Sequence, residues 1–377
     1  MGYQICSRCV FDESVGNIEF LENGICSYCE MVRTLLHKYG TGTQKGENFF
    51  QKIKESIQQA GRGRPYDCVV GVSGGVDSSY LLLKAKEWGL RPLAVHYDNT
   101  WNSAVASMNI AKITESLDVD LITVVANNKE IDDIKMSFLK AGVPEFDADT
   151  DIALVQVLRK TAARFGIKYI LEGHSFVAEG ISPPTVNYFD GKYIADVHKK
   201  HGTIPLKHYP NLTLYQFLKW SIIYRQKFIR PFWYLKYSRE EAKQRLLDET
   251  DWQDYGGHHL ENLSTAFLHK IWLPYRFKVD LRNLLVAADV RSGLKNRQQG
   301  LEELKIKPSW ETDYVELVQK RLKLDEREFQ HYMDQPLRFS NSYKTYKKTF
   351  EILQPLFWLL TKLELVPMSF YLKYCKK

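Results

Sequence analysis

The sequence has no long hydrophobic run. Its most apolar stretch, residues 353–365, is short and is broken by Pro355, Lys362 and Glu364. A helix that crosses a bilayer needs about 20 consecutive, mostly apolar residues, so we predict no transmembrane segment. The first residues are polar and include two closely spaced cysteines, which is not the pattern of a secretory signal peptide. We therefore expect a cytoplasmic protein.

The sequence also lacks a strong excess of one charge. Its net charge is +7 over 377 residues, and hydrophobic and charged residues make up 44% and 26% of the chain, as in ordinary globular proteins. So small an excess does not require a nucleic-acid partner, although it suits an anionic substrate such as a nucleotide. The length predicts two or three domains.

Cysteine is scarce and is concentrated near the N-terminus. Four of the six cysteines form the pairs Cys6-x-x-Cys9 and Cys26-x-x-Cys29, with polar turn residues and glycines between them. Two such pairs supply the four thiolates of a tetrahedral structural zinc site, which we predict here. An iron–sulfur cluster is the alternative, since four thiolates also suit iron. Two disulfides are disfavoured by a reducing cytoplasm.

Two common nucleotide-binding motifs, Gly-x-x-x-x-Gly-Lys-Ser/Thr and Gly-x-Gly-x-x-Gly, do not occur. Instead, an apolar run at residues 68–72 leads into Ser-Gly-Gly-Val-Asp-Ser-Ser at residues 73–79, which opens an apolar helix. A glycine-rich turn from strand to helix lets backbone N–H groups face a phosphate at the positive end of the helix dipole. We therefore predict a phosphate-binding loop at residues 73–79.

Strands and helices alternate through the first half of the chain. The predicted strands lie at residues 68–72, 93–97, 120–125 and 169–172, and the predicted helices at 78–88, 103–117, 132–140 and 152–165. This alternation predicts an α/β fold with a parallel sheet covered by helices on both faces. Ligands of such sheets bind at the carboxyl ends of the strands.

Four regions are expected along the chain. They are a four-cysteine zinc knuckle at residues 1–36, a linker and helix at 37–62, an α/β nucleotide-binding domain at 63–200, and a mostly helical substrate or partner region at 201–377. The last region ends in a basic, aromatic segment.

Polar residues follow the second predicted strand. They are Asp98, Asn99, Trp101 and Asn102, and they are suited to hold ribose, adenine or a metal. An Asx turn would use the same residue types, so the polar cluster alone does not decide between ligand binding and local structure.

A second polar cluster follows the strand at residues 169–172. Gly173 permits a close backbone approach, and Glu179 would join Asp77 around magnesium, which prefers hard oxygen ligands. His174 would polarise or deprotonate a reacting group, unless it is a structural residue at the strand end.

A third cluster lies at residues 254–262. His258, His259 and Glu261 are metal-ligand types, but their spacing is not the His-Glu-x-x-His of zinc proteases. We prefer contact with phosphate or substrate at a helix start opened by Gly256 and Gly257.

The loop at residues 73–79 resembles the PP-loop of ATP pyrophosphatases, which cleave ATP between its α and β phosphates. Further motifs are the cysteine knuckle and residues 98–103, 172–175, 179–181, 190–194 and 255–261. Together they resemble the N-acetyl sugar amidotransferase family, of the WbpG/PseA type, used in surface-polysaccharide (LPS O-antigen) and flagellin-sugar biosynthesis. The resemblance extends from residue 1 to about residue 345.

This resemblance implies an adenine nucleotide alpha-hydrolase-like PP-loop fold and an ATP-dependent synthetase. Members of the family convert an acetamido group of a nucleotide-activated sugar into an acetamidino group. The implied route passes through an O-adenylyl intermediate, and ammonia supplies the nitrogen. The implied ligands are ATP, Mg²⁺ and a structural Zn²⁺.

The resemblance also implies three sets of site residues. The catalytic set is Asp77, His174, Glu179, His259 and Glu261, with Asp77 and Glu179 also holding magnesium. The nucleotide-binding set is Ser73, Gly74, Gly75, Asp77, Ser78, Ser79, Asp98, Asn99 and Gly173. The substrate-binding set is Trp101, Asn102, Lys192 and His258. Relatives tend to carry lysine where this chain has His258, and a histidine is mostly neutral near pH 7, so the role of this position is open.

The chain shows no glutaminase motif. Position 2 is glycine, and no cysteine sits in a nucleophile elbow with a His-x-Glu partner. We therefore expect a separate HisH-like glutaminase to supply ammonia, with a HisF-like subunit as a further candidate partner. Two other readings remain: a PP-loop tRNA-thiolation enzyme, which would need Cys68 as its cysteine near the ATP site, and a non-catalytic nucleotide-binding module.

Overall fold

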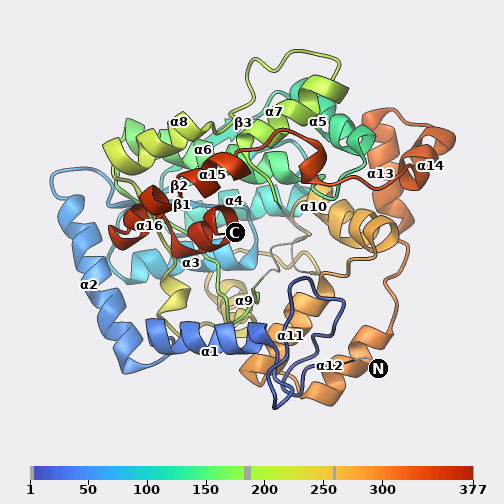
Figure 1. Cartoon of the computed structure of the whole chain (residues 1–377). Helices are drawn as coiled ribbons and strands as arrows, with labels where there is room; N and C mark the ends of the chain where they lie inside the picture. The colour runs from blue at the N-terminus through green and yellow to red at the C-terminus, as the bar shows by residue number, and fades with distance from the viewer. Residues whose placement is uncertain (1–3, 182–187, 258–259, 377) are drawn as a thin grey trace.

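The computed structural model describes residues 4–181, 188–257 and 260–376. At its centre is a parallel sheet with the strand order β3-β2-β1-β4-β5 (Figure 1). The strands are β1 (Cys68–Gly71), β2 (Pro92–Asp98), β3 (Leu121–Val125), β4 (Tyr169–Leu171) and β5 (Lys227–Ile229). The predicted α/β fold with a parallel sheet is confirmed.

Both faces of the sheet carry a hydrophobic core. Val69 and Val70, neighbours in β1, are fully buried in different clusters because successive side chains of a strand point to opposite faces. Val70 packs with Leu81 and Leu82, and Val69 packs with Val157. A strand covered on both sides reads as a continuous apolar run, which is why this strand is visible in the sequence.

The helices between the strands are present near their predicted positions: α3 (Val76–Glu87), α4 (Ala104–Ser116), α5 (Asn128–Ala141) and α6 (Ala148–Arg164). Their ends have local causes. The Ser103 hydroxyl accepts a hydrogen bond from the N–H of Ala106 at the start of α4, and the Asn127 side chain accepts one from Glu130 at the start of α5.

The fifth strand was not predicted. β5 pairs with β4 through Tyr169–Lys227, Ile170–Phe228 and Leu171–Ile229, although it lies in the region expected to be mostly helical. It follows α8 (Leu214–Leu218) and the π-helix η1 (Lys219–Ile223). Three residues are too few to show a strand pattern in sequence, so this edge of the sheet is set by pairing with β4 rather than by local preference.

The strand order reverses beside β1. Chain order runs from β1 to β2 and β3 on one side, and β4 and β5 lie on the other. In such sheets the connections leave β1 and β4 in opposite directions, which opens a crevice at their carboxyl ends. The predicted phosphate loop, between β1 and α3, lies at this point.

The N-terminal knuckle packs against a distant part of the chain. In Figure 1 it lies beside α11 (Arg282–Ser292) and α12 (Arg297–Lys305), and α1 (Ser27–Tyr39) and α2 (Gln44–Ala60) follow it. Phe11 and Tyr28 from the knuckle share a buried cluster with Val286 and Ala287 from α11.

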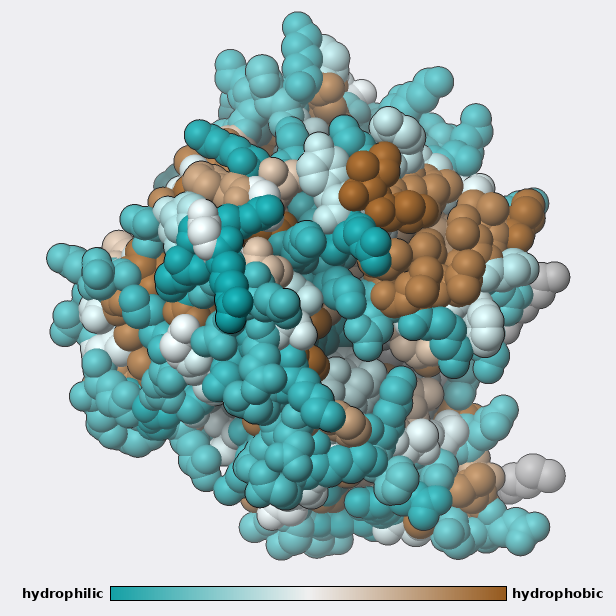
Figure 2. All heavy atoms as spheres, turned by 90° about the vertical axis from the view of Figure 1, so that its left-hand side faces the viewer, coloured by the Kyte–Doolittle hydropathy of each residue, from teal (hydrophilic) through white to brown (hydrophobic). Residues whose placement is uncertain are grey.

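The remaining elements complete the molecule. They are α7 (Gly191–His201), the 3-10 helix η2 (Pro231–Trp233), α9 (Arg239–Glu249), α10 (Leu263–Phe267), the π-helix η3 (Leu268–Phe277), α13 (Thr312–Leu322), α14 (Glu326–Asp334), the 3-10 helix η4 (Ser340–Ser342), α15 (Lys347–Ile352), α16 (Gln354–Lys362), α17 (Met368–Phe370) and the π-helix η5 (Tyr371–Cys375). Several apolar side chains on the C-terminal elements remain exposed (Figure 2). Within the described ranges, every helix is too short or too polar to cross a bilayer.

Candidate active site

The loop after β1 is held in shape by its own serines. The Ser73 hydroxyl lies 3.2 Å from the Ser78 hydroxyl and accepts a 3.3 Å hydrogen bond from the N–H of Gly75. The Ser78 hydroxyl also accepts from the N–H of Ser73 at 3.2 Å. These contacts turn the loop tightly onto the start of α3, where backbone N–H groups favour an anion.

Gly74 can only be glycine in this arrangement. Its φ is +79°, and a Cβ there would lie 2.2 Å from the carbonyl oxygen of Ala106 in α4. The carbonyl oxygen of Gly74 accepts hydrogen bonds from Trp252 Nε1 at 3.0 Å and from Asn109 Nδ2 at 3.3 Å. The loop is therefore clamped between α4 and the segment that leads to residues 254–262.

Two predicted clusters meet beside this loop. Asn102, after β2, forms a β-bridge with Asn262, and Asn262 Nδ2 donates to the side-chain oxygens of Asn102 at 3.0 Å and Asn99 at 2.9 Å. The N–H of Ser103 donates to the carbonyl oxygen of Glu261 at 2.8 Å. Motifs 150 or more residues apart in the chain thus form one wall.

Asn102 also fixes a histidine that the sequence analysis did not single out. Its Nδ2 lies 3.1 Å from His96 Nε2, and His96 Nδ1 donates to the carbonyl oxygen of Val72 at 2.9 Å. Burial lowers the pKa of His96, which keeps the ring neutral and consistent with these two roles.

Asn99 and Trp101, both predicted to contact ligands, are buried in the protein. Asn99 is fully buried and donates to Thr150 Oγ1 at 2.8 Å. Trp101 is also fully buried, donates from Nε1 to Asp132 at 3.1 Å, and is covered by the Arg321 guanidinium 4.1 Å from its ring. Both side chains therefore contact other segments of the protein and support the polar loop after β2. Asp98 accepts from the N–H of Thr100 at 2.7 Å, which is the Asx turn considered above.

The end of β4 approaches the start of α3 closely. A Cβ on Gly173 would lie 2.7 Å from the carbonyl oxygen of Asp77, so this position needs glycine for its size rather than its φ. Carboxylates from the two segments lie near the same tyrosine. Burial raises the pKa of the Tyr237 hydroxyl most, and both Asp77 and Glu179 raise it further, so the two carboxylates share one region.

Both predicted magnesium carboxylates have protein donors. Asp77 Oδ1 accepts a short hydrogen bond from the Tyr237 hydroxyl, and Glu179 Oε1 accepts from the N–H of Ser175 at 2.9 Å. Two carboxylates beside a phosphate loop are the donor set that Mg²⁺ takes, so these residues fit the ion. Tyr237 carries no sequence signal, because it lies 160 residues from its partner.

Glu261 reaches the phosphate loop. A Cβ built on Gly75 would lie 2.9 Å from Glu261 Oε1 and 3.1 Å from the Tyr255 hydroxyl. Burial and then the Glu261 carboxylate raise the pKa of Tyr255, so its hydroxyl remains a donor at neutral pH. His258 and His259, the other predicted members of this cluster, lie outside the described residues.

His174 is oriented by a tryptophan. Trp233 Nε1 donates to His174 Nδ1 at 3.1 Å. An indole N–H only donates, so Nδ1 is the acceptor and a neutral ring carries its proton on Nε2. In this tautomer His174 can polarise a reacting oxygen by donating to it, and the geometry favours that role over proton abstraction.

Some of these groups line one cavity of about 1090 Å³. The predicted site residues on its wall are Ser73, Ser78, Asn102, Gly173, His174, Glu179 and Glu261. The knuckle loop (Phe11 and residues 14–16) and residues 278–285 form another part of the wall. Its volume and its mixed polar and apolar lining suit a nucleotide together with a second substrate.

Other predicted residues, Asp77 among them, are not part of this wall. Ser79 is fully buried, and Lys192 sits with its ammonium nitrogen 5.4 Å from the centre of the Tyr346 ring. Cys68, the cysteine that a thiolation enzyme would need, is fully buried, and burial raises the pKa of its thiol well above the ordinary value. Such a thiol is unreactive.

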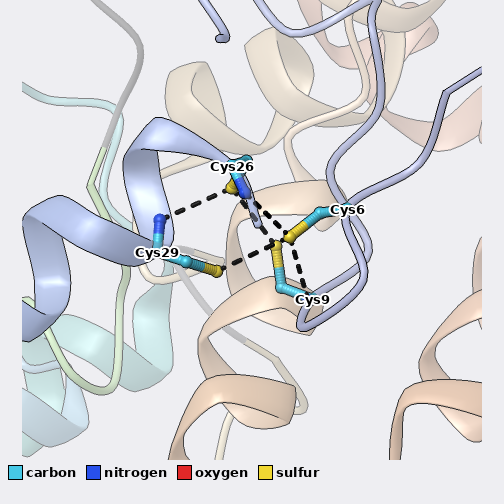
Figure 3. A group of neighbouring side chains, drawn as sticks. All are labelled: Cys6, Cys9, Cys26 and Cys29. Carbon is cyan, nitrogen blue, oxygen red and sulfur yellow. Dashed lines mark hydrogen bonds between the residues drawn. The ribbon is translucent and has the colours of Figure 1, made fainter. Parts of the chain in front are cut away.

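The four paired cysteines converge on one point (Figure 3). Their sulfurs lie 3.8 Å apart in the pairs Cys6–Cys29 and Cys9–Cys26. A tetrahedron with metal–sulfur bonds of about 2.3 Å has an edge of about 3.8 Å, so the spacing fits one metal ion. An iron–sulfur cluster binds its thiolates through different irons and holds them further apart.

A cation supports this centre. Arg291 donates to Cys29 Sγ and Cys9 Sγ, both at 3.3 Å. Burial lowers the pKa of Arg291, but the sulfurs of Cys9 and Cys29 raise it above its ordinary value. A guanidinium that donates to two of the four sulfurs favours thiolates, which is the state that a metal requires.

Comparison with protein-family models matches residues 261–356 to the LPS biosynthesis protein WbpG-like, C-terminal domain. This segment of the chain is therefore similar to the WbpG-like C-terminal domain, which confirms the predicted resemblance where it is matched. Comparison with curated proteins finds no match.

Comparison with solved structures finds chains of low identity. NMN synthetase from Francisella tularensis is 11% identical, with 78% of this chain and 97% of that chain covered and a TM-score of 0.32. NH3-dependent NAD synthetase from Campylobacter jejuni is 12% identical, with coverages of 78% and 98% and a TM-score of 0.33. U34-tRNA thiolase NcsA from Methanococcus maripaludis is 11% identical, with coverages of 74% and 91% and a TM-score of 0.34. At these values the comparison does not bear on activity.

Proposed function

We propose that the chain is the synthetase subunit of an ATP-dependent amidotransferase that converts an acetamido group of a nucleotide-activated sugar into an acetamidino group. One observation carries the proposal. Glu261, the first residue of the WbpG-like segment, lies against the phosphate loop at Gly75, and residues of both segments line a single cavity. The WbpG-like segment and the phosphate loop therefore meet at one cavity.

The chemistry accounts for the need for ATP. An amide carbon is a poor electrophile, so its oxygen first attacks the α phosphorus, and pyrophosphate leaves. Ammonia then adds to the carbon of the O-adenylyl imidate, and AMP leaves with the former amide oxygen. The N–H groups of the loop, with Ser73 and Ser78 on the cavity wall, would hold the departing pyrophosphate.

The other residues have separate tasks. Asp77 and Glu179 would hold magnesium, which neutralises phosphate charge when bound. His174, with its proton on Nε2, would donate to an oxygen that gains negative charge. The knuckle, for which we propose zinc, supplies part of the wall from residues 14–16 and so has a structural task near the second substrate.

Ammonia would come from a separate protein, with a HisH-like glutaminase as the proposed source and a HisF-like companion as a further candidate. All six cysteines of this chain are buried, and four of them belong to the knuckle, which leaves no accessible thiol for glutamine hydrolysis. The matched family description supports lipopolysaccharide biosynthesis as the pathway, and the family resemblance adds flagellin-sugar biosynthesis as an alternative.

The test is an assay for AMP and pyrophosphate with the purified chain, ATP, an ammonium salt and a panel of nucleotide-linked diacetamido sugars. We expect one sugar to raise AMP formation together with formation of an amidine. Glutamine in place of ammonium should give little product with the chain alone. If no sugar of the panel raises AMP formation, or if the chain alone uses glutamine as well as ammonium, the proposal is contradicted.

A single variant separates this reaction from tRNA thiolation. Cys68→Ser should leave amidine formation unchanged, because the thiol is buried in β1. A thiolation enzyme that used this cysteine would lose its activity.

A further inference from the structure

The helix α16 is apolar on both of its sides. Phe357 and Leu360 face inward and are buried in a cluster with Phe350 and with α8 side chains such as Phe217. On its outer side, Leu359 is half exposed. A helix that is hydrophobic all round is normally buried all round, and α16 is covered on one side only.

Exposed apolar side chains lie on both α15 and α16. Ile352 ends α15 and is 78% exposed, Leu356 and Leu359 lie three residues apart on one face of α16, and Leu363 directly follows that helix. The π-helix η1, which follows α8 directly, adds Ile223, which is 70% exposed. We call these five side chains the C-terminal apolar face. Figure 2 shows a large brown area on this side of the molecule.

Exposed lysines lie on the same helices as the C-terminal apolar face. Residues 343–377 contain seven lysines and two glutamates. Lys347, Lys348 and Lys362 are exposed, and Lys362 lies 5.2 Å from the ring of Trp358, which is itself half exposed. One of the two glutamates, Glu364, is paired with Lys227 at 3.0 Å. These three exposed lysines, the lysine rim of the face, give this surface a positive charge.

This combination distinguishes among the surfaces that could cover the face. Protein–protein interfaces are depleted in lysine and draw their binding energy from aromatic residues and arginine, whereas this face is aliphatic with a lysine rim. A second copy of the chain would bring two lysine rims together. An anionic bilayer offers an apolar interior for the isoleucines and leucines, negative headgroups for the lysines, and an interface suited to Trp358.

We propose that the C-terminal apolar face is a peripheral binding surface for anionic phospholipid membranes. The aliphatic side chains enter the boundary between headgroups and acyl chains, and the lysines contact the headgroups. Such binding lies in the plane of the membrane and needs no spanning helix. It goes beyond the proposed reaction and does not depend on it.

The test is flotation of the full chain with vesicles of phosphatidylcholine alone, or of phosphatidylcholine in which about one lipid in three is phosphatidylglycerol, without ATP or sugar. We expect binding to the anionic vesicles only. It should weaken when salt rises from about 0.1 M to about 1 M, over which the Debye length falls from about 10 Å to about 3 Å.

Two variants test the two parts of the surface. Leu363→Asp removes apolar burial and should weaken binding about 10- to 100-fold. Its matched control is Leu294→Asp, since Leu294 lies in another part of the chain and is 55% exposed against 54% for Leu363. Replacing Lys347, Lys348 and Lys362 by alanine should weaken binding on the order of 100-fold, at about fivefold for each lysine near a charged surface.

Three results would overturn the proposal. The first is no flotation with anionic vesicles at low salt. The second is equal flotation of the Leu363→Asp and native chains. The third is a concentration-dependent dimer in ultracentrifugation that Leu363→Asp dissociates while vesicles remain unbound, which would assign the face to contact between proteins. Circular dichroism checks that each variant is folded.

Discussion

Two acidic clusters lie close to the sheet, and they are built in opposite ways. The first is the buried lysine cluster, in which Lys135 of α5 pairs with Asp147 and, at 2.7 Å, with Asp149. Asp147 also accepts from Ser264 in α10 at 2.7 Å. The second is the set of strand-end carboxylates, Asp77, Glu179 and Glu261, at the phosphate loop.

The two clusters differ in the groups that contact their carboxylates. Lys135 and Asp149 are fully buried, and burial raises the pKa of Asp149 to about 6 although Lys135 opposes it. Among the strand-end carboxylates, Asp77 and Glu179 accept hydrogen bonds from neutral donors, a tyrosine hydroxyl and a backbone N–H. The buried cation of the first cluster ties helices together, whereas the second set brings carboxylates from separate segments to the phosphate loop, where their oxygens suit a bound cation.

Replacing the cation of the first cluster should have the largest effect. Lys135→Met leaves two buried carboxylates without their partner, and we expect unfolding to become easier by about 3–5 kcal/mol. Urea unfolding followed by circular dichroism measures the change. Lys129→Met, at an exposed lysine of the same helix, is the control and should change stability little. Adding Asp149→Asn to Lys135→Met should recover part of the loss, and no recovery would contradict the ionic explanation.

Replacing a strand-end carboxylate should lower activity and leave stability almost unchanged. Asp77→Asn should leave stability within about 1 kcal/mol of the native value, because the amide oxygen can still accept from Tyr237. AMP formation should fall about 10²- to 10³-fold, since a charge that supports the transition state is lost. A large loss of stability with little loss of turnover would place Asp77 with the structural cluster instead.

The sequence predicted the fold well where a single element carries its own pattern. Strand β1 is an apolar run because both of its faces are buried. The phosphate loop is recognisable in the sequence by its glycines, since the φ of Gly74 and its close contact with α4 admit no side chain. Four cysteines in two pairs are equally local. The short strand β5 has no such pattern, since it exists only through pairing with β4.

The contacts of individual side chains were not predicted, and the reason is the distance between partners in the sequence. A polar residue at a strand end has the same sequence signature whether it faces a ligand or another segment. Asn99 contacts Thr150 and Asn262, and Trp101 lies under Arg321, so both support the loop from within the protein. Tyr237 and Trp233, which orient Asp77 and His174, lie in an aromatic stretch where nothing marks them out.

Glu145 combines features of the two clusters, because it lines the cavity and is also buried. Burial raises its pKa to about 7 from 4.5, while the Tyr193 hydroxyl, which donates at 2.8 Å, opposes the rise. A carboxyl with a raised pKa in the folded state contributes stability that is present below pH 4.5 and is lost as the pH rises through 7.

Glu145→Gln should therefore show a pH-dependent advantage. At pH 4.5 the variant and the native chain should differ little, and by pH 7.5 the variant should have gained on the order of 3 kcal/mol relative to the native chain. Urea unfolding of both chains at several pH values between these limits measures the gain. A difference that does not change with pH would show that Glu145 is as readily ionised as an exposed carboxyl.

The smallest effect is expected at His174. The question there is whether the ring donates the proton on its Nε2 or accepts a proton from the substrate. Because Trp233 donates to Nδ1, the ring offers an Nε2–H to the site, and glutamine can replace that donor. His174→Gln should lower the rate of AMP formation about tenfold, the value of one neutral hydrogen bond, and should leave the shape of the pH–rate profile unchanged. A general base would behave differently: its removal would cost about 10²- to 10⁴-fold and would abolish the acid limb of the profile. The profile thus separates a donor from a base even if the two rates were similar.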